Sequence, residues 1–228
     1  MKALQELIDD GALIAVSWGG GVNSTSMLIG LQERGIRPDL ILFADTGGEK
    51  PETYEHIFEL DCWLQVHGMP SCLIVHNRSA HESLEAECLT NKTLPGLAFG
   101  NRGCSVKWKK QPMEQWAKEW QPAIDCWARG ERVRKSIGFD WGEGHRAHIP
   151  DDKCYTYEYP LVEWEWDREA CVAAIKRAGL KVPSKSACFF CPNQKPWGVR
   201  DLLTPEERGM VMELERAAEP YKIGRAHV

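Results

Sequence analysis

The chain has 228 residues, of which 43% are hydrophobic and 27% charged, a balance typical of a globular protein. Its formal net charge of −5 argues against a general affinity for nucleic acid, which leaves nucleic acid only as a specific substrate. The apolar runs are too short to span a bilayer and the acidic start is not a secretory signal, so we expect a cytoplasmic protein with no membrane partner.

The first half of the chain alternates short apolar runs with helix-like segments. Strands are predicted over Ala12–Ser17, Asp39–Asp45 and Ser71–His76, and helices over Val22–Arg34 and Pro51–His67. Strands that are apolar throughout and separated by helices indicate a parallel sheet covered by helices on both faces. We therefore predict an α/β fold of Rossmann-like type.

The second half is less regular. Its pattern predicts helices over Gln111–Trp120, Asp167–Ala178 and Pro205–Ala218, and one further strand over Val133–Phe139. The helix signals include an N-cap residue at the start of each of the last two helices.

A break in the periodicity near Ala147–Lys153 suggests a domain boundary. We expect a nucleotide-binding domain over residues 1–150 and a small, cysteine-bearing helical segment over residues 151–222. Residues 223–228 match the translation of a common sequencing-library adapter, so we expect them to be read-through and the natural C-terminus to be missing.

The strongest signal lies between the first strand and the first helix, in the segment SWGGGVNST. Glycines let the backbone expose its N–H groups, which form an anion site together with a helix N-terminus. A tight turn without a ligand is the alternative. The segment is neither a Walker A loop nor a dinucleotide fingerprint, because the Lys-Ser/Thr pair and the G-x-G-x-x-G spacing are absent. The candidate phosphate ligands are Ser17, Gly19, Gly20, Gly21, Asn23, Ser24 and Thr25.

This segment resembles the PP-loop of ATP pyrophosphatases and phosphoadenosine-phosphosulfate (PAPS) reductases, usually written S-G-G-x-D-S. Three more segments match that family in order: Phe43–Tyr54 (F-A-D-T-G-x-E-x-P-E-T-Y), Cys104–Pro112 (C-T-x-x-Y-K-x-x-P) and Ile137–Ala147 (I-G-x-x-x-x-E-x-x-R-A). Tyr159–Pro192 is similar to a branch found in phages and mobile elements. The chain thus resembles the PAPS reductase family of the PP-loop superfamily over nearly its whole length.

The resemblance implies further contacts to a nucleotide, either ATP or PAPS. Asp45 and Thr46 are expected beside it, at the carboxyl end of a strand. Lys109 and Arg146 are expected to hold its far anionic group, the lysine as a point charge and the arginine as a bidentate clamp. An ion pair with Glu143, three residues before Arg146, is expected to orient the clamp.

Besides Ser105 for Thr and Trp108 for Tyr in the segment Cys104–Pro112, two departures from the family bear on its chemistry. Asn23 stands where the family has Asp, and an amide cannot lend a carboxylate's charge to Mg²⁺, which counts against the pyrophosphatase chemistry. PAPS reductases also carry a nucleophilic cysteine in a C-terminal E-C-G motif, which thioredoxin then reduces. That motif is absent, which counts against sulfate reduction.

Nine cysteines without a secretory signal argue against a disulfide framework. Cys188 and Cys191 form a C-x-x-C pair whose spacing lets two thiolates share a metal. Related family members can hold an iron–sulfur cluster, and the resemblance makes Cys104, Cys188 and Cys191 the candidate catalytic residues and metal ligands. A [4Fe–4S] cluster is ranked ahead of zinc, and a redox disulfide or two packed thiols are the alternatives.

The other candidate side chains fall into two groups. Three residues are unranked candidates for a fourth metal ligand: His145, His148 and Cys154. Core packing is expected for the remaining cysteines, which are Cys62, Cys72, Cys88, Cys126 and Cys171.

Two reactions fit these features and are ranked nearly level. In the first, which the family resemblance favours, a thiol or a cluster reduces the sulfate of a PAPS-like nucleotide with a thiol reductant as partner. In the second, ATP is cleaved to AMP and pyrophosphate to activate an oxygen, which sulfur from a donor protein replaces on RNA, DNA or a small molecule. A non-catalytic nucleotide-binding module is a third hypothesis.

Overall fold

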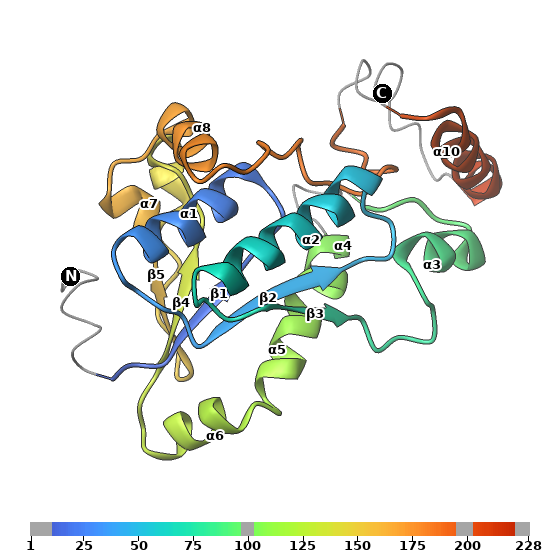
Figure 1. Ribbon diagram of the computed structural model, residues 1–228. Helices are drawn as coiled ribbons and strands as arrows, with labels where there is room; N and C mark the ends of the chain where they lie inside the picture. Colours follow the sequence, from blue (N-terminus) through green and yellow to red (C-terminus); the bar gives the residue numbers. More distant parts are fainter. Residues whose placement is uncertain (1–10, 97–102, 195–202, 222–228) are drawn as a thin grey trace. The chain divides into compact units, whose positions relative to one another are not determined.

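The computed structural model describes residues 11–96, 103–194 and 203–221 (Figure 1). The strands are β1 (Ile14–Ser17), β2 (Leu40–Asp45), β3 (Cys72–His76), β4 (Val133–Ile137) and β5 (Tyr155–Glu158). The α-helices are α1 (Val22–Glu33), α2 (Pro51–Val66), α3 (Leu84–Asn91), α4 (Gly103–Ser105), α5 (Gln111–Ala117), α6 (Gln121–Ala128), α7 (Pro160–Glu163), α8 (Arg168–Arg177) and α10 (Pro205–Ala218). Shorter turns are the π-helix η3 (Val106–Lys110) and the 3₁₀ helices η4 (Trp141–Arg146) and η5 (Glu219–Tyr221).

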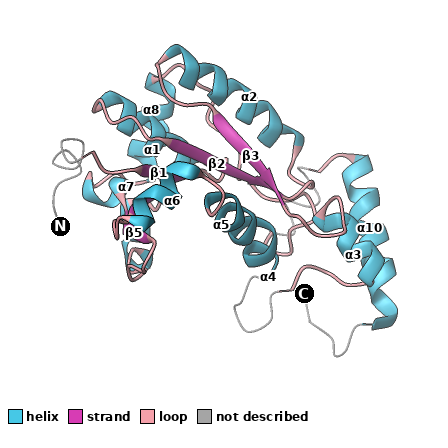
Figure 2. Cartoon of the chain, turned by 90° about the horizontal axis from the view of Figure 1, so that it is seen from below, coloured by secondary structure: helices cyan, strands magenta, loops and turns pink. Residues whose placement is uncertain are grey.

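The strands form one sheet in the order β3-β2-β1-β4-β5. β1 pairs in parallel with β2 and with β4, and β4 pairs in parallel with β5. Helices α1, α2 and α8 cover one face of the sheet and α6 lies on the other, as Figures 1 and 2 show. The predicted Rossmann-like α/β fold is therefore confirmed.

The strand order reverses at β1. The chain winds outward from β1 to β2 and β3, and later returns to place β4 on the other side of β1. In doubly wound sheets ligands bind at such a reversal, at the carboxyl ends of the two diverging strands. The crevice expected here lies where β1 ends at Ser17 and β4 ends at Ile137.

The chain divides into two compact units, each made of several segments. Unit 1 comprises Met1–Phe43, Pro51–Val75 and Met113–Ser186, and unit 2 comprises the intervening segments and the remainder, Ala44–Lys50, His76–Pro112 and Ala187–Val228. The core of unit 1 joins β1 and β2 to α1, α2 and α8 through residues such as Val16, Leu28, Ile41, Leu64 and Ile175.

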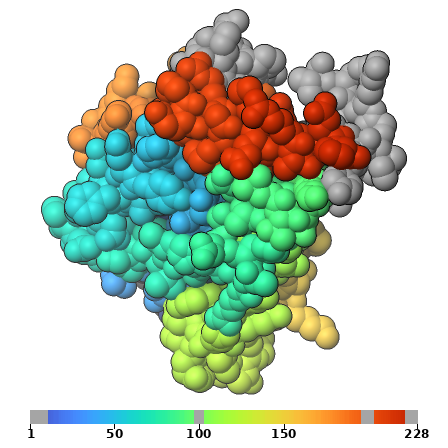
Figure 3. Space-filling model, turned by 90° about the vertical axis from the view of Figure 1, so that its right-hand side faces the viewer, coloured from blue at the N-terminus to red at the C-terminus, as the bar shows by residue number. Residues whose placement is uncertain are grey.

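Unit 2 has a smaller core of its own. It contains Leu84 and Cys88 of α3, Trp108 of η3, Leu214 of α10, and Phe189 from the segment before α10. Helix α10 packs on α3, where the red and green surfaces meet in Figure 3.

The expected domain boundary near residue 150 does not coincide with these units. β5 joins the sheet beside β4, and α8 packs against α1, so residues well beyond 150 complete unit 1. β5 reads Tyr-Thr-Tyr-Glu and was not predicted, because its polar residues and the preceding Pro, Asp and Lys resemble a linker. The expected adapter residues 223–228 lie outside the described part of the chain.

Two helix ends follow the expected chemistry. Asp167 caps α8 by accepting from the Ala170 amide at 2.8 Å, and Thr204 forms a capping box with Glu207 at the start of α10. The strands are less uniform than expected, because β4 reads Val-Arg-Lys-Ser-Ile and Leu73 and Ile74 of the edge strand β3 are exposed. No helix in the described ranges has the length and apolar character needed to cross a bilayer.

Candidate functional site

The glycine-rich segment forms a tight connection between β1 and α1. Gly20 has φ of +72°, a left-handed conformation that favours glycine, and a Cβ there would come within 3.3 Å of Thr53. The Ser24 hydroxyl accepts from the Gly19 amide at 3.2 Å and donates to the Gly21 carbonyl at 3.2 Å. The loop is therefore closed on the first turn of α1, as an anion-binding connection requires.

A buried chain of hydrogen bonds supports the loop from behind. The indole of Trp18 is fully buried and donates to the Thr25 hydroxyl at 3.1 Å, which lies 2.9 Å from Nε2 of His56. Burial lowers the pKa of His56 to about 4, so this imidazole is neutral at neutral pH. Thr25 was expected to bind phosphate, and it lies instead beneath the loop as one of its supports.

A cavity of about 430 Å³ opens at the crevice between β1 and β4. Its walls come from the glycine loop, from the end of β4, from η4 and α8, and from a segment ahead of Cys188. Six of the expected nucleotide ligands or clamps line it: Ser17, Gly19, Gly21, Asn23, Ser24 and Arg146. The sequence motif and the switch point of the sheet thus mark the same place.

Three cations and one carboxylate line this cavity. Arg146, Arg168 and Lys185 bring positive charge, and Glu143 is the negative group among the lining residues. The expected ion pair between Glu143 and Arg146 is present, and the Arg146 guanidinium also lies 4.3 Å from the ring centre of Phe139. The lining suits an anionic ligand.

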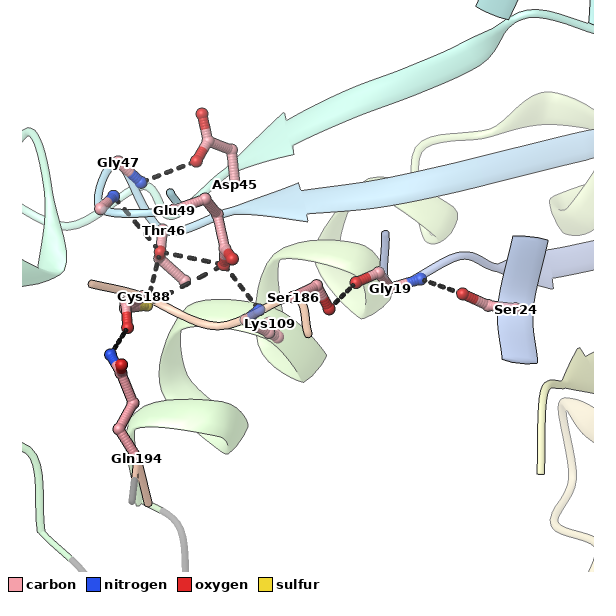
Figure 4. A network of polar contacts seen from close by, with 11 residues as sticks. Gly19, Ser24, Asp45, Thr46, Gly47, Glu49, Lys109, Ser186, Cys188 and Gln194 are labelled. Carbon is pink, nitrogen blue, oxygen red and sulfur yellow. Dashed lines mark hydrogen bonds and ion pairs between the residues drawn. The ribbon is translucent and has the colours of Figure 1, made fainter. Parts of the chain in front are cut away.

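The sequence analysis missed several of these residues. Arg168 directly follows the cap of α8, and Lys185 lies two residues after a proline, where a basic residue is typical of a solvated surface. The segment containing Lys185 is tied to the loop, because the Ser186 hydroxyl donates to the Gly19 carbonyl at 2.6 Å (Figure 4). Only the folded chain brings these distant positions to the glycine loop.

Asn23 is the most connected side chain of the cavity wall. Its amide nitrogen donates to Asp140 at 3.0 Å and to Glu143 at 2.9 Å, and its amide oxygen accepts from Arg168 at 3.0 Å. Both the nitrogen and the oxygen of the Asn23 amide, at the position where the family pattern has Asp, are therefore hydrogen-bonded to charged side chains.

Unit 2 holds a second polar group, which Figure 4 also shows. The Glu49 carboxylate is completely buried, and its Oε1 accepts from Lys109 at 2.6 Å and from Thr46 at 3.3 Å. Cys188 Sγ lies 3.0 Å from the Thr46 hydroxyl and 3.9 Å from Glu49 Oε1. Lys109 was expected to bind an anionic ligand, and here it pairs with the buried carboxylate of Glu49.

In this cluster the thiol of Cys188 stays neutral and the amine of Lys109 stays charged. Burial, reinforced by the Glu49 carboxylate, raises the pKa of Cys188 to about 12. Burial opposes the charge of Lys109, but its ion pair with Glu49 is stronger and raises the pKa of Lys109. Glu49 Oε2 is buried and has no hydrogen-bond partner among the described residues. Asp45 caps the turn, accepting from the Gly47 amide at 2.8 Å.

The three candidate metal ligands belong to the core of unit 2. Cys188 is buried in it, and Cys104 and Cys191 pack against it. Among the described residues, however, no three His, Cys, Asp or Glu side chains are grouped closely enough to hold a metal ion. The thiols therefore share one apolar cluster without forming a ready ligand set. The fourth-ligand candidates His145, His148 and Cys154 belong to unit 1.

The remaining cysteines mostly follow the expectation. Cys88, Cys126 and Cys171 are buried, and Cys72 is half-buried. The prediction of core packing was wrong for Cys62, which is exposed on α2. All nine thiols are free.

No protein-family model matches the sequence, and no curated protein matches it. Solved structures do match, among them the "U34-tRNA thiolase NcsA from Methanococcus maripaludis with its [4Fe-4S] cluster", with a TM-score of 0.54. The match covers 95% of this chain and 78% of the thiolase at 16% sequence identity. The two chains share a fold. At this identity the likeness concerns the fold and not the activity.

Proposed function

We propose that this chain is a nucleotide-binding enzyme that uses ATP to activate an oxygen atom, which sulfur then replaces. The observation that carries the proposal is the cation-lined cavity at the glycine loop, where Arg146, Arg168 and Lys185 surround a backbone anion site. The fold shared with a tRNA thiolase favours this reaction over the reduction of a sulfonucleotide, which the family resemblance had placed first.

The proposed reaction has two steps. The acceptor oxygen attacks the α-phosphorus of ATP, and pyrophosphate leaves with the electrons of the bond that joined it to that phosphorus. A sulfur nucleophile from a donor then attacks the activated carbon, and AMP leaves carrying the oxygen. The neighbour is a tRNA thiolase, so RNA is the acceptor to test first.

The residues of the cavity take distinct parts in this scheme. The loop at Gly19 and Gly21 would hold the phosphates by backbone N–H groups, and Arg146 with Arg168 would stabilise the charge that develops on pyrophosphate. Ser186, bonded to Gly19, would fix the wall opposite α1.

We also propose that three cysteines of unit 2 bind an iron–sulfur cluster. Cys104, Cys188 and Cys191 share one apolar cluster, and they are the residues that would hold a [4Fe–4S] cluster. Such a cluster, when bound, would supply a site that holds the sulfur before transfer. Iron and acid-labile sulfide should fall in the Cys191→Ala variant, and should be unchanged in Cys62→Ala, which alters an exposed thiol.

The experiment for the main proposal measures nucleotide binding by the full chain purified without oxygen. ATP should raise the melting temperature, since a ligand at 100 times its Kd adds about 2.7 kcal/mol to the free energy of unfolding. Arg146→Ala should weaken ATP binding about tenfold or more, because a charge-assisted contact is lost. Arg177→Ala is the matched control, because Arg177 pairs with Glu33 on the surface and does not line the cavity.

The choice of nucleotide separates the alternatives. Stabilisation by adenosine 3′,5′-bisphosphate but not by ATP would favour PAPS reduction instead. Binding of ATP without release of pyrophosphate, with any RNA or small-molecule acceptor, would favour a non-catalytic module. An equal loss of ATP binding in Arg146→Ala and Arg177→Ala would show that the cavity is not the site.

A further inference from the structure

The side chain of Asn23 is hydrogen-bonded to three charged groups. Its amide nitrogen donates to one oxygen of Asp140 and one oxygen of Glu143, at 3.0 and 2.9 Å. On the other side its amide oxygen accepts from Arg168 at 3.0 Å, and Glu143 continues the network to Arg146. All of these contacts lie within unit 1.

Two carboxylates that share one neighbour repel each other unless positive charge lies between them. Here the NH₂ group of Asn23, with its two partly positive hydrogens, occupies that place. An aspartate at position 23 would instead bring a third carboxylate against Asp140 and Glu143. Oxygen ligands arranged in this way are what Mg²⁺ or Ca²⁺ requires.

The carboxylates present here do not fit a metal held by the loop. Asp140 accepts from the Glu143 amide through Oδ1 and from Asn23 through Oδ2. Glu143 uses Oε1 for Arg146 and Oε2 for Asn23. All four carboxylate oxygens therefore already accept from a donor, and Arg168 adds positive charge beside the same amide. Each carboxylate oxygen at this position is thus engaged by a donor, and Arg146 and Arg168 lie in the same network, which counts against the Mg²⁺ site implied by the PP-loop resemblance.

We infer that Asn23 is a positioning residue that replaces a divalent cation at the phosphate loop. Its amide holds Asp140 and Glu143 together, and the charge of the ligand is neutralised by Arg146, Arg168 and Lys185 without a metal ion bound by the loop. The part that concerns ligand charge rests on the proposed function. The part that concerns Asn23 and its carboxylate neighbours stands on the contacts alone.

The test compares melting temperatures in EDTA and in Mg²⁺ or Ca²⁺, with no nucleotide present. The wild-type chain should melt at the same temperature in each buffer. Asn23→Asp should melt several degrees lower in EDTA, because carboxylate repulsion is introduced and hydrogen bonds are lost, and should recover when either cation is added. Asn91→Asp, which adds the same charge on an exposed helix end of unit 2, should show no cation rescue.

A second variant keeps the inference testable if Asn23→Asp does not fold. In the double variant Asn23→Asp with Asp140→Asn, the amide and the carboxylate exchange places, and the number of carboxylates returns to two. This variant should regain most of the stability in EDTA. Asparagine also serves as an N-cap, so the start of η4 should survive the exchange.

ATP binding, measured in both buffers, separates this inference from the proposed function. Wild-type affinity should differ by no more than about threefold between EDTA and Mg²⁺, a change of less than 1 kcal/mol. ATP binding only with Mg²⁺, a wild-type chain that Mg²⁺ alone stabilises, or Asn23→Asp as stable in EDTA as wild type would each overturn the inference. ATP binding in neither buffer, with cation rescue of Asn23→Asp intact, would instead overturn the proposed function.

Discussion

His56 supports the glycine loop through a buried hydrogen bond. Its Nε2 is bonded to Thr25, whose hydroxyl also receives the indole N–H of Trp18. The imidazole is 3% exposed, and its Nδ1 has no partner among the described residues. Protonation would place a charge in this apolar layer, which is why its pKa is lowered to about 4.

This buried histidine predicts an acid-dependent stability. The unfolded chain takes up a proton near pH 6.5 and the folded chain only near pH 4, so the stabilising term is complete above pH 6.5 and is lost as the pH falls towards 4. The loss should be on the order of 3 kcal/mol over this window. Urea unfolding at pH 7 and pH 4 measures it, and His56→Gln should flatten the pH dependence. A slope that His56→Gln leaves unchanged would assign the effect to other groups.

At the scale of single residues, the sequence predicted the loop and the Glu143–Arg146 pair, because each lies within one short motif. It could not find Asp140 or Arg168 as partners of Asn23, since contacts between residues more than 100 positions apart depend on the sheet order. Lys109 was assigned to a ligand because it matches the lysine of the family pattern, and its pairing with Glu49, 60 positions away, depends on the fold.

Between elements, the cavity depends on a close approach of backbones. Gly138 follows β4, and a Cβ built there would lie 2.8 Å from Ser24 Cα and 2.9 Å from Ser24 N. These are backbone atoms of the first turn of α1, which cannot move aside as a flexible side chain can. Because Gly138 has no Cβ, the end of β4 can lie against the backbone where the glycine loop enters α1.

Gly138→Ala should destabilise the fold by about 1–3 kcal/mol and weaken nucleotide binding, because α1 must shift away from β4. Gly209→Ala is the matched control. Nothing lies within 4 Å of a Cβ at Gly209 in α10, so this change should be neutral or stabilise by up to about 1 kcal/mol. Urea unfolding and ATP titration of both variants check the prediction, and equal behaviour of the two would refute the close-approach argument.

The sequence predicted the elements of the first half well, since β1, β2, α1 and α2 have clear apolar periods and end signals. It missed α3, α6 and β5, which are short and mostly polar or amphipathic. The sheet pairs β4 with β1 despite the arginine and lysine of β4, so tertiary pairing overrides local composition there.

For the whole molecule, the two compact units alternate along the chain and do not follow a division at residue 150. The core of unit 1 includes Leu161, Cys171, Ala174 and Ile175, all fully buried and all beyond that point. Arg168 of α8 also reaches back to Asn23. A fragment that ends at residue 150 lacks β5 and one helix from the face of the sheet.

We therefore predict that residues 1–150 alone do not form a cooperative fold. The fragment should show a broad, weak thermal transition by circular dichroism and poorly dispersed amide resonances, whereas the full chain should unfold in one or two sharp steps. A control fragment ending at residue 194 retains all of the described part of unit 1. A sharply unfolding 1–150 fragment would support the boundary suggested by the sequence.

The interleaving of the units also bears on how the protein is made. The segment of unit 2 at His76–Pro112 leaves the ribosome before Met113–Ser186, which unit 1 needs in order to close its core. Unit 1 can therefore close its core only once residue 186 has been synthesised, after two segments of unit 2 have already been made, so it cannot fold from one contiguous N-terminal stretch. The apolar residues of β1, β2 and α1 therefore wait for those of α8 until late in synthesis, and apolar surface exposed in this way is prone to aggregation.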